Sequence, residues 1–462
     1  MLRPLLSVFF VSLLVCGCPR PKDAQVSRDA GVAPPTTAPA SVAPILSVAH
    51  NEPDAAPPKP VGPAGPASDL NVILISIDSL RADMPWAGYA RPIAPALTEL
   101  EKRAVTFTRG YSISSYTSMS LGGLLGGKMP GEMKRDGFFF GTYAKENLMF
   151  PELLQAAKIR TMAVHAHGYF KNTGLDQGFD KWEIVPNITF KNTTDENVTG
   201  PAHEAIAERL LGDPKNDDAR FFAWFHFLDP HDQYISHEPE IPAWGKSARD
   251  RYDGEVTFTD KQIAKLLAFI ASKPWASRTA IIITADHGEA FGEHGQYSHG
   301  FDLWEHLIHV PLFFVLPGVA PRHIEEARSA IDLAPTICGL LGVEPDAGFE
   351  GKSLVPELYG QATPGPRDIP LDLPMTSDSD RRRGLIHGTN KMIAFGASGP
   401  VQMFDLEKDP VEKEPIAKGE LYAESLARYR AFEKSLKDVP PYACRETCLN
   451  GAYLKTADAG KE

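Results

Sequence analysis

The chain contains 462 residues, of which 43% are hydrophobic and 23% charged, and its formal net charge is −12. This length and apolar content can bury a large core, in one α/β body with an appendage or in two or three domains. No basic stripe balances the acidic excess, which argues against nucleic acid as a partner but not against small anionic substrates. The five cysteines are too few and too scattered for a disulfide framework.

Residues 1–18 have the pattern of an export signal. Arg3 precedes an apolar run, residues 5–15, that is too short to span a bilayer comfortably. The run ends in the letters VCGC, which resemble a bacterial lipobox and predict Cys18 as the lipidated residue. We therefore expect a lipoprotein anchored in the bacterial cell envelope, on the periplasmic side or the outer surface. An ordinary signal peptide with incidental cysteines is the alternative.

The segment that follows predicts a tether. Residues 19–68 hold twelve of the forty prolines and no aromatic residue, a composition that buries too little apolar surface to fold. The rest divides into a predicted catalytic domain over 69–358, a C-terminal subdomain over 359–440 and a tail over 441–462.

The catalytic region alternates apolar runs with amphipathic segments, which predicts an α/β fold with a mostly parallel central sheet flanked by helices. Helices are expected over 95–104 and 151–157, which begin with proline near the first turn, and over 255–270, which is apolar along one face. We interpret 186–200 as a polar surface loop. The predicted strands cover residues 72–77, 160–164, 221–228, 280–284 and 310–315.

Beyond about residue 360 the segments become shorter. Residues 384–387, 391–395 and 401–406 predict a small antiparallel sheet, and a helix is expected over roughly 420–436. Cys338 is expected in the core. Cys444 and Cys448 are close enough to pair, although a free pair is equally compatible.

Carboxylates and imidazoles follow four of the predicted strands. They are Asp78, then His165 and His167, then Asp229 and His231, then Asp286 and His287. Because the carboxyl ends of parallel strands form one edge of a sheet, these side chains should converge. Each alone is more often a cap or turn residue. Together they predict a divalent-metal site built from Asp78, Asp286 and His287.

Several motifs appear in an order that resembles the sulfatase branch of the alkaline-phosphatase superfamily. They are NVILISIDSLR from Asn71, FHFLDPHDQY from Phe225, TADHGE from Thr284 with GEHG and HG after it, and FDLEKDP from Phe404. The resemblance covers about residues 70 to 415. It implies an ester hydrolase with one large α/β domain and a smaller C-terminal subdomain around an antiparallel sheet.

By position, the resemblance makes Thr117 the nucleophile, because it lies ten residues before the last glycine of Leu124-Leu-Gly-Gly127. It makes Asp78, Asp286 and His287 metal ligands together with Thr117. This threonine should open a helix, whose amides and dipole favour a bound anionic ester. Plain helix capping by Thr117 is the alternative.

The departures from the family pattern bear on the metal and the ester. Met119 and Leu121 stand where sulfatases carry the proline and arginine that signal formylglycine formation. Ser79 replaces a frequent second aspartate, which weakens the case for calcium. His299 occupies a place that is often lysine. We expect one divalent ion, with manganese, magnesium or zinc favoured and calcium as an alternative. A second metal at Asp229, His231 and His299 is disfavoured.

These residues predict a metal-dependent hydrolase or transferase of phosphoric or sulfuric esters that acts through a covalent Thr117 intermediate. His231 or His299 would protonate the leaving alcohol at a near-neutral pKa, and both would contact the substrate together with His167. A sulfatase without formylglycine is one alternative, and an inactive binding or structural lipoprotein is the other.

The substrate itself is predicted only as a class. A small-molecule or polymer ester is expected, such as a lipid headgroup, a cell-wall polymer or a polysaccharide. The lipid anchor would hold the protein at a membrane.

Overall fold

A computed structural model describes residues 65–188, 198–377 and 379–442. The predicted signal peptide, Cys18 and nearly all of the predicted tether lie outside these ranges, as do Cys444, Cys448 and most of the loop predicted over 186–200. Within the described ranges, no helix is long and apolar enough to cross a membrane.

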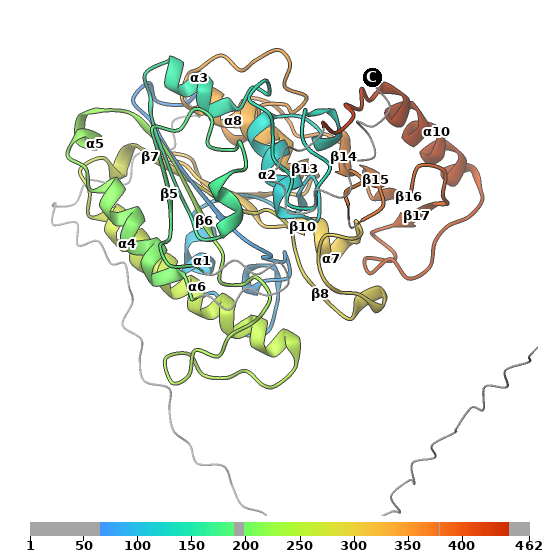
Figure 1. The fold of residues 1–462 in the computed structure, drawn as a ribbon, viewed down its shortest axis with the longest axis horizontal. Coiled ribbons are helices and arrows are strands. Elements are labelled where there is room, and N and C mark those ends of the chain that lie inside the picture. Colours follow the sequence, from blue (N-terminus) through green and yellow to red (C-terminus); the bar gives the residue numbers. More distant parts are fainter. Residues whose placement is uncertain (1–64, 189–197, 378, 443–462) are drawn as a thin grey trace, which may run out of the picture. The chain divides into compact units, whose positions relative to one another are not determined.

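A sheet forms the centre of the fold, with helices on either side (Figure 1). It has eight strands in the order β12-β2-β11-β7-β1-β6-β4-β5. The five strands from β7 to β5 run parallel, and β11 is antiparallel to both of its neighbours. The predicted mostly parallel sheet is therefore confirmed. The strands are β1 (Asn71–Ile77), β2 (Val105–Phe107), β4 (Arg160–His165), β5 (Lys181–Ile184), β6 (Phe221–Phe227), β7 (Thr279–Ala285), β11 (Leu312–Val315) and β12 (Arg322–Ile324).

One predicted strand differs. Residues 310–315 divide at Pro311, which has no N–H to offer a sheet ladder. The residues before it form β10 (His309–Val310), which pairs with β3 (Gly110–Tyr111) in a separate small sheet with β13 (Arg328–Ser329). The residues after it continue into the central sheet as β11.

Helices cover both faces of the sheet, because β1 buries alternate residues on opposite sides. Val72 and Leu74 belong to the core beneath α2 (Thr117–Gly126), α3 (Phe150–Ala156) and α8 (Leu333–Leu340). Ile73 and Ile75 pack toward the helices of the other face, where α4 and α6 lie side by side (Figure 1). Those helices are α1 (Pro95–Glu101), α4 (Gly200–Leu211) and α6 (Ala248–Ala271).

Helix α6 begins earlier than the apolar pattern predicts. Ser247 caps it in a capping box: the Ser247 hydroxyl accepts from the Asp250 N–H, and Asp250 accepts from the Ser247 N–H at 2.9 Å. The first two turns are polar and carry ion pairs, so apolar periodicity does not reveal them.

The C-terminal part contains the predicted antiparallel sheet, in the order β14-β15-β16-β17, and α10 (Glu420–Ser435) packs against it. The edge strand β14 was not predicted from the sequence, because Pro370 interrupts the apolar pattern there. Cys338 is buried, as expected. The strands are β14 (Asp368–Leu373), β15 (Arg382–His387), β16 (Asn390–Phe395) and β17 (Val401–Asp405).

Short elements complete the described chain. They are the hairpin of β8 (Ala290–Phe291) and β9 (Tyr297–Ser298), the helices α5 (Lys215–Asp218), α7 (Glu305–Ile308) and α9 (Val355–Leu358), and the 3-10 turns Pro85–Ala87, Pro130–Glu132, Gly168–Lys171, Ala276–Arg278, Glu293–Gly295 and Ala330–Asp332.

Candidate functional site

The carboxyl ends of β1 and β7 bring the predicted carboxylates together. Ile77 of β1 is in register with Ala285 of β7, so Asp78 and Asp286 leave the sheet side by side. Both side chains are buried. The convergence expected at this edge of the sheet is therefore present in the fold.

His287 lies between the two carboxylates and the hydroxyl of Thr117. Its Nε2 is 3.6 Å from Asp78 Oδ1, 3.4 Å from Asp286 Oδ2 and 3.1 Å from Thr117 Oγ1. The ring's Nδ1 lies 2.9 Å from the Gly288 carbonyl, which can only accept. This contact assigns the proton to Nδ1 and leaves the Nε2 lone pair facing the carboxylates and the threonine.

Thr117 is the first residue of α2, with Tyr116 at the N-cap position and no side-chain cap. The alternative that Thr117 merely caps the helix does not hold, because its hydroxyl faces His287. Its position beside the free amides of the first turn suits an anionic ligand.

His226, which was not predicted from the sequence, faces the same carboxylates from the penultimate position of β6. Its Nε2 is 3.4 Å from Asp78 Oδ2 and 4.0 Å from Asp286 Oδ2. Asp78, His226 and Asp286 form a buried group whose ligand atoms could hold a metal ion. The sequence signal was a single histidine within an otherwise apolar strand.

The electrostatics of the two carboxylates differ. Burial works to raise the pKa of Asp78, but His231, His226 and His287 outweigh it and hold that pKa well below its usual range. The pKa of Asp286 is raised, first by burial and then by the charge of Asp78. Two adjacent buried carboxylates of this kind favour the binding of a cation.

The remaining predicted histidines lie beside this group. The ring centroid of His299 is 4.2 Å from that of His287 and 4.9 Å from that of His231, and the rings of His231 and His167 are 6.3 Å apart. His167 Nδ1 accepts from the Tyr169 N–H, so the neutral ring carries its proton on Nε2 and can donate there.

Burial lowers the pKa of both His299 and His167 to about 3. The expectation of a near-neutral pKa for His299 is therefore wrong for the site without substrate, because charging a buried imidazole is unfavourable. A bound anionic ester would raise this pKa. His299 would consequently act as a proton donor only with substrate in place.

Glu289 supports His299 and was not expected from the sequence, although it belongs to the TADHGE motif. Its Oε1 lies 3.2 Å from His299 Nδ1, and the carboxylate is buried. Burial raises the pKa of Glu289 to about 7. The contact fixes the orientation of the His299 ring.

Two other predicted positions have structural partners instead. Asp229 accepts from the Thr199 N–H at 2.7 Å and from the Thr199 hydroxyl at 3.1 Å, at the start of α4. This carboxylate already accepts two hydrogen bonds at the start of α4. A second metal bound by Asp229, His231 and His299 is therefore disfavoured. His165 is buried between Phe170 and Trp182 and lies in the core.

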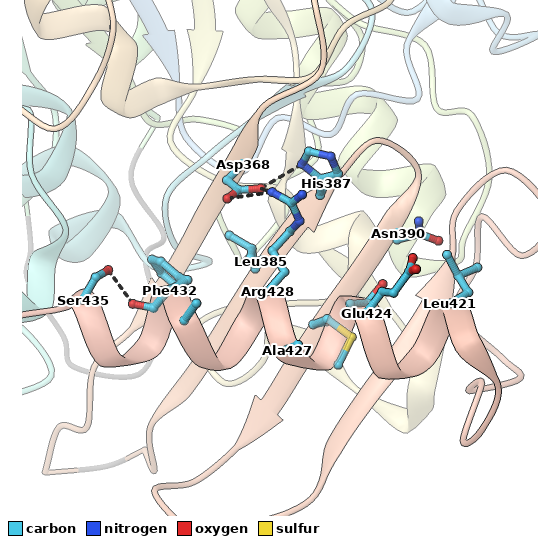
Figure 2. A pocket seen from close by; sticks show the side chains of 13 residues that line it. Asp368, Leu385, His387, Asn390, Leu421, Glu424, Ala427, Arg428, Phe432 and Ser435 are labelled. Atoms are coloured by element: carbon cyan, nitrogen blue, oxygen red, sulfur yellow. Dashed lines mark hydrogen bonds and ion pairs between the residues drawn. The ribbon is translucent and has the colours of Figure 1, made fainter.

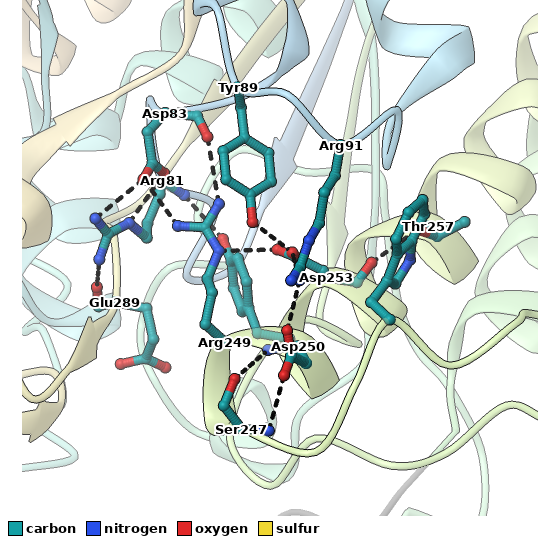
Figure 3. A network of polar contacts seen from close by, with 12 residues as sticks. Arg81, Asp83, Tyr89, Arg91, Ser247, Arg249, Asp250, Asp253, Thr257 and Glu289 are labelled. Atoms are coloured by element: carbon teal, nitrogen blue, oxygen red, sulfur yellow. Dashed lines mark hydrogen bonds and ion pairs between the residues drawn. The ribbon is translucent and has the colours of Figure 1, made fainter. Parts of the chain in front are cut away.

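A network of arginines fixes the loops that carry the site (Figure 3). Arg81 Nη1 donates to the Glu289 carbonyl at 2.8 Å, which ties the loop after β1 to the loop after β7. Arg249 of α6 donates to Asp83 and Asp253, each at 2.8 Å. Helix α6 therefore holds both site loops against the sheet.

A cavity of about 310 Å³ is lined by Asp232 and Ser298, the chain neighbours of His231 and His299. A larger cavity, of about 880 Å³, lies between α10 and β15–β16 (Figure 2). There Asp368 already pairs with His387 at 2.8 Å and with Arg428 at 3.1 Å, and the group of described residues that could hold a metal ion lies elsewhere. None of Asp78, Thr117, Asp286 and His287 lines either cavity, so we define the functional site by these converging side chains. The lining of the smaller cavity includes Asp232, Tyr234, Arg251, Phe291, Tyr297 and Ser298.

The fold and the site together define an ester hydrolase of the alkaline-phosphatase-like superfamily. Residues 70–343 match the sulfatase family model, and residues 292–438 match the model of the N-sulphoglucosamine sulphohydrolase C-terminal region. The chain therefore belongs to the sulfatase family.

Individual relatives are distant. The chain is 21% identical to a choline-sulfatase of Rhizobium meliloti, over 83% of this chain and 92% of that protein. It is 26% identical to a Delta 4,5-hexuronate-2-O-sulfatase of Bacteroides thetaiotaomicron, over 52% of this chain but only 50% of that protein. The structure of a phosphonate monoester hydrolase of Agrobacterium radiobacter matches 79% of this chain and 96% of its own, with a TM-score of 0.63 and 19% identity. This last likeness establishes the fold alone.

Proposed function

We propose that this chain is a metal-dependent hydrolase or transferase of the cell envelope, anchored through Cys18, that cleaves phosphoric esters in preference to sulfuric esters. Thr117 carries the proposal: it opens α2, and its Oγ1 lies 3.1 Å from His287 Nε2 beside two buried carboxylates. Met119 and Leu121 replace the formylglycine signal, so Thr117 itself is the nucleophile.

Asp78, Asp286, His287 and Thr117 would hold one divalent cation. The residues fit such an ion, because the buried Asp286 Oδ2 has no hydrogen-bond partner within the described chain. When bound, the cation would lower the pKa of the Thr117 hydroxyl and polarise an oxygen of the ester.

The positions of the side chains support the following reaction. The Thr117 alkoxide attacks phosphorus, and the Oγ–P bond forms as the P–O bond to the leaving alcohol breaks. The leaving oxygen takes its proton from His231 or His299. Amides of the first turn of α2 and the Nε2–H of His167 stabilise the other phosphoryl oxygens.

The second half regenerates the enzyme. Water, or an acceptor alcohol, attacks phosphorus and gives its proton to the same histidine, while the P–Oγ bond of Thr117 breaks. Hydrolysis releases phosphate, and transfer releases a new ester. The leaving alcohol, from a small molecule or a polymer, would extend toward the cavity of about 310 Å³ that is lined by Asp232 and Ser298, the chain neighbours of His231 and His299.

Sulfuric-ester hydrolysis is the second candidate, and the names of the relatives favour it. A formylglycine enzyme releases sulfate by breaking a C–O bond, with help from a second hydroxyl on the same carbon. Thr117 has only one hydroxyl, so a sulfothreonine would need attack by water at sulfur. We expect that route to be slow.

A panel of chromogenic phosphomonoesters, phosphodiesters and sulfate esters, assayed with several metals, tests the proposal. Phosphoester activity should exceed sulfatase activity and should be lost in Thr117→Ala. Ser118→Ala is the matched control, because this neighbouring hydroxyl donates to the Phe139 carbonyl, and it should retain activity. A sulfatase activity higher than the phosphoester activity would contradict the proposed preference for phosphoric esters. Lack of both stoichiometric metal and activity would favour a binding module.

A further inference from the structure

His226 and Asp286 each present an unpartnered buried atom to the same point. Within the described chain, His226 Nε2 and Asp286 Oδ2 have no hydrogen-bond partner, and they lie 4.0 Å apart. Asp78 Oδ2 lies 3.4 Å from the same nitrogen. Unsatisfied polar atoms in a fully buried location are costly unless something absent from the protein chain satisfies them.

The other side of the ring fixes its orientation. His226 Nδ1 lies 2.8 Å from Ser76 Oγ, which also accepts from Trp224 Nε1 at 2.8 Å. Ser76 and His226 are register partners on neighbouring strands, so the contact is built into the sheet. A metal-binding histidine is commonly oriented in this way by a partner of its other nitrogen.

The tautomer of His226 decides what its Nε2 can do. The contact with Ser76 suits either tautomer, because a hydroxyl can donate to Nδ1 or accept from it. Binding of a cation requires the proton on Nδ1, donated to Ser76, so that Nε2 presents a lone pair to the carboxylates; a proton on Nε2 would instead be directed at Asp78 Oδ2 across 3.4 Å. His287 has the same arrangement, with Nδ1 on the Gly288 carbonyl.

We infer that His226 is a direct ligand of the cation held by Asp78, Asp286 and His287, and that its nitrogen makes the site select zinc over calcium. This inference rests on the metal dependence proposed above. Two carboxylates, two imidazoles and the Thr117 hydroxyl form a mixed nitrogen and oxygen set that suits zinc, whereas calcium takes six to eight oxygens. Ser79 supplies no further carboxylate, and its hydroxyl instead donates to Asp78 Oδ1 at 3.0 Å.

Metal binding to the full-length protein, stripped with a chelator and titrated separately with zinc and calcium, tests the inference. His226→Gln should weaken zinc binding by more than about 100-fold and change calcium binding little. Ser76→Ala should weaken zinc binding about 10- to 100-fold, because the imidazole loses its orienting partner. His165→Gln is the control, since this histidine is equally buried on the adjacent strand β4, and it should bind zinc normally.

A spectroscopic readout keeps the test independent of folding and of activity. Pulsed electron paramagnetic resonance of the unaltered protein loaded with manganese should detect two coordinated imidazole nitrogens. A single nitrogen, or unchanged zinc affinity in a folded His226→Gln protein, would overturn the inference. If zinc binds as expected but no ester is cleaved, the proposed function fails while the ligand assignment stands.

Discussion

At the scale of single residues, the site holds two neighbouring carboxylates whose negative charges repel each other until a cation binds. The carboxylates of Asp78 and Asp286 are buried side by side, and burial together with Asp78 raises the pKa of Asp286. We expect Asp286→Asn to lose most bound metal and activity. Without metal, the same change removes a repulsion, so the metal-free variant should unfold at a temperature equal to or above that of the parent.

Elemental analysis and thermal unfolding check both parts of this prediction. Unchanged metal occupancy in Asp286→Asn would place the ion elsewhere. A large fall in the unfolding temperature of the metal-free variant would show that Asp286 has a structural role instead.

The sequence predicted the site residues that follow strand ends or sit at a motif spacing. Asp78, Asp286, His287 and Thr117 converge as expected, because strand order and register bring their backbones together. His226 was not predicted, since it lies within β6 rather than after its end, and only the register with Ser76 reveals its role. For Asp229, the sequence could not show that Thr199, thirty residues earlier, would occupy its carboxylate.

At the scale of elements, apolar periodicity predicted the main strands and much of α6, and it failed where local chemistry dominates. Pro311 divides one predicted strand, and a polar first section of α6 extends the helix back to Ala248. The missing backbone N–H of Pro311 ends one strand, and the capping box at Ser247 begins α6. These local interactions set the boundaries, and the apolar pattern does not show them.

Asp260 links α6 to α1, and its protonation should make stability depend on pH. Its carboxylate accepts from the Ala96 and Leu97 N–H groups, each at 2.9 Å, yet burial still raises its pKa to about 7. An unfolded aspartate has a pKa near about 4. Between about pH 4 and pH 7 the folded state therefore holds the proton more tightly, and stability from this group falls as the pH rises.

Denaturant unfolding at pH 5 and pH 7.5 measures this contribution. We expect the parent protein to lose more stability between these values than Asp260→Asn does, since the amide does not titrate. Equal losses in the two proteins would contradict the assignment.

At the scale of the whole molecule, Lys391 joins the C-terminal sheet to the α/β body. Its buried ammonium lies 2.7 Å from Glu412 Oε1 and 3.2 Å from Glu305 Oε2 of α7. Lys391→Met would leave two facing carboxylates without their cation, so we expect a loss of about 3–5 kcal/mol in the free energy of unfolding. A loss below about 1 kcal/mol by denaturant titration would show that the subdomain is held chiefly by apolar contacts.

Attachment to the envelope is a prediction from the sequence alone. Cys18→Ala should leave the protein unprocessed or released from membranes, while the folded domain keeps its activity. Membrane fractionation measures this. A variant that is processed normally and still partitions fully with lipid would refute the lipobox interpretation.

Trapping the covalent intermediate tests the central claim most directly. Turnover of a phosphoester is quenched in acid, and the peptide containing Thr117 is examined by mass spectrometry. The proposed mechanism predicts one added phosphoryl group on Thr117, present only with substrate and absent from Thr117→Ala. Robust multiple turnover with no adduct on this peptide would contradict the covalent mechanism and leave only the fold and the family in place.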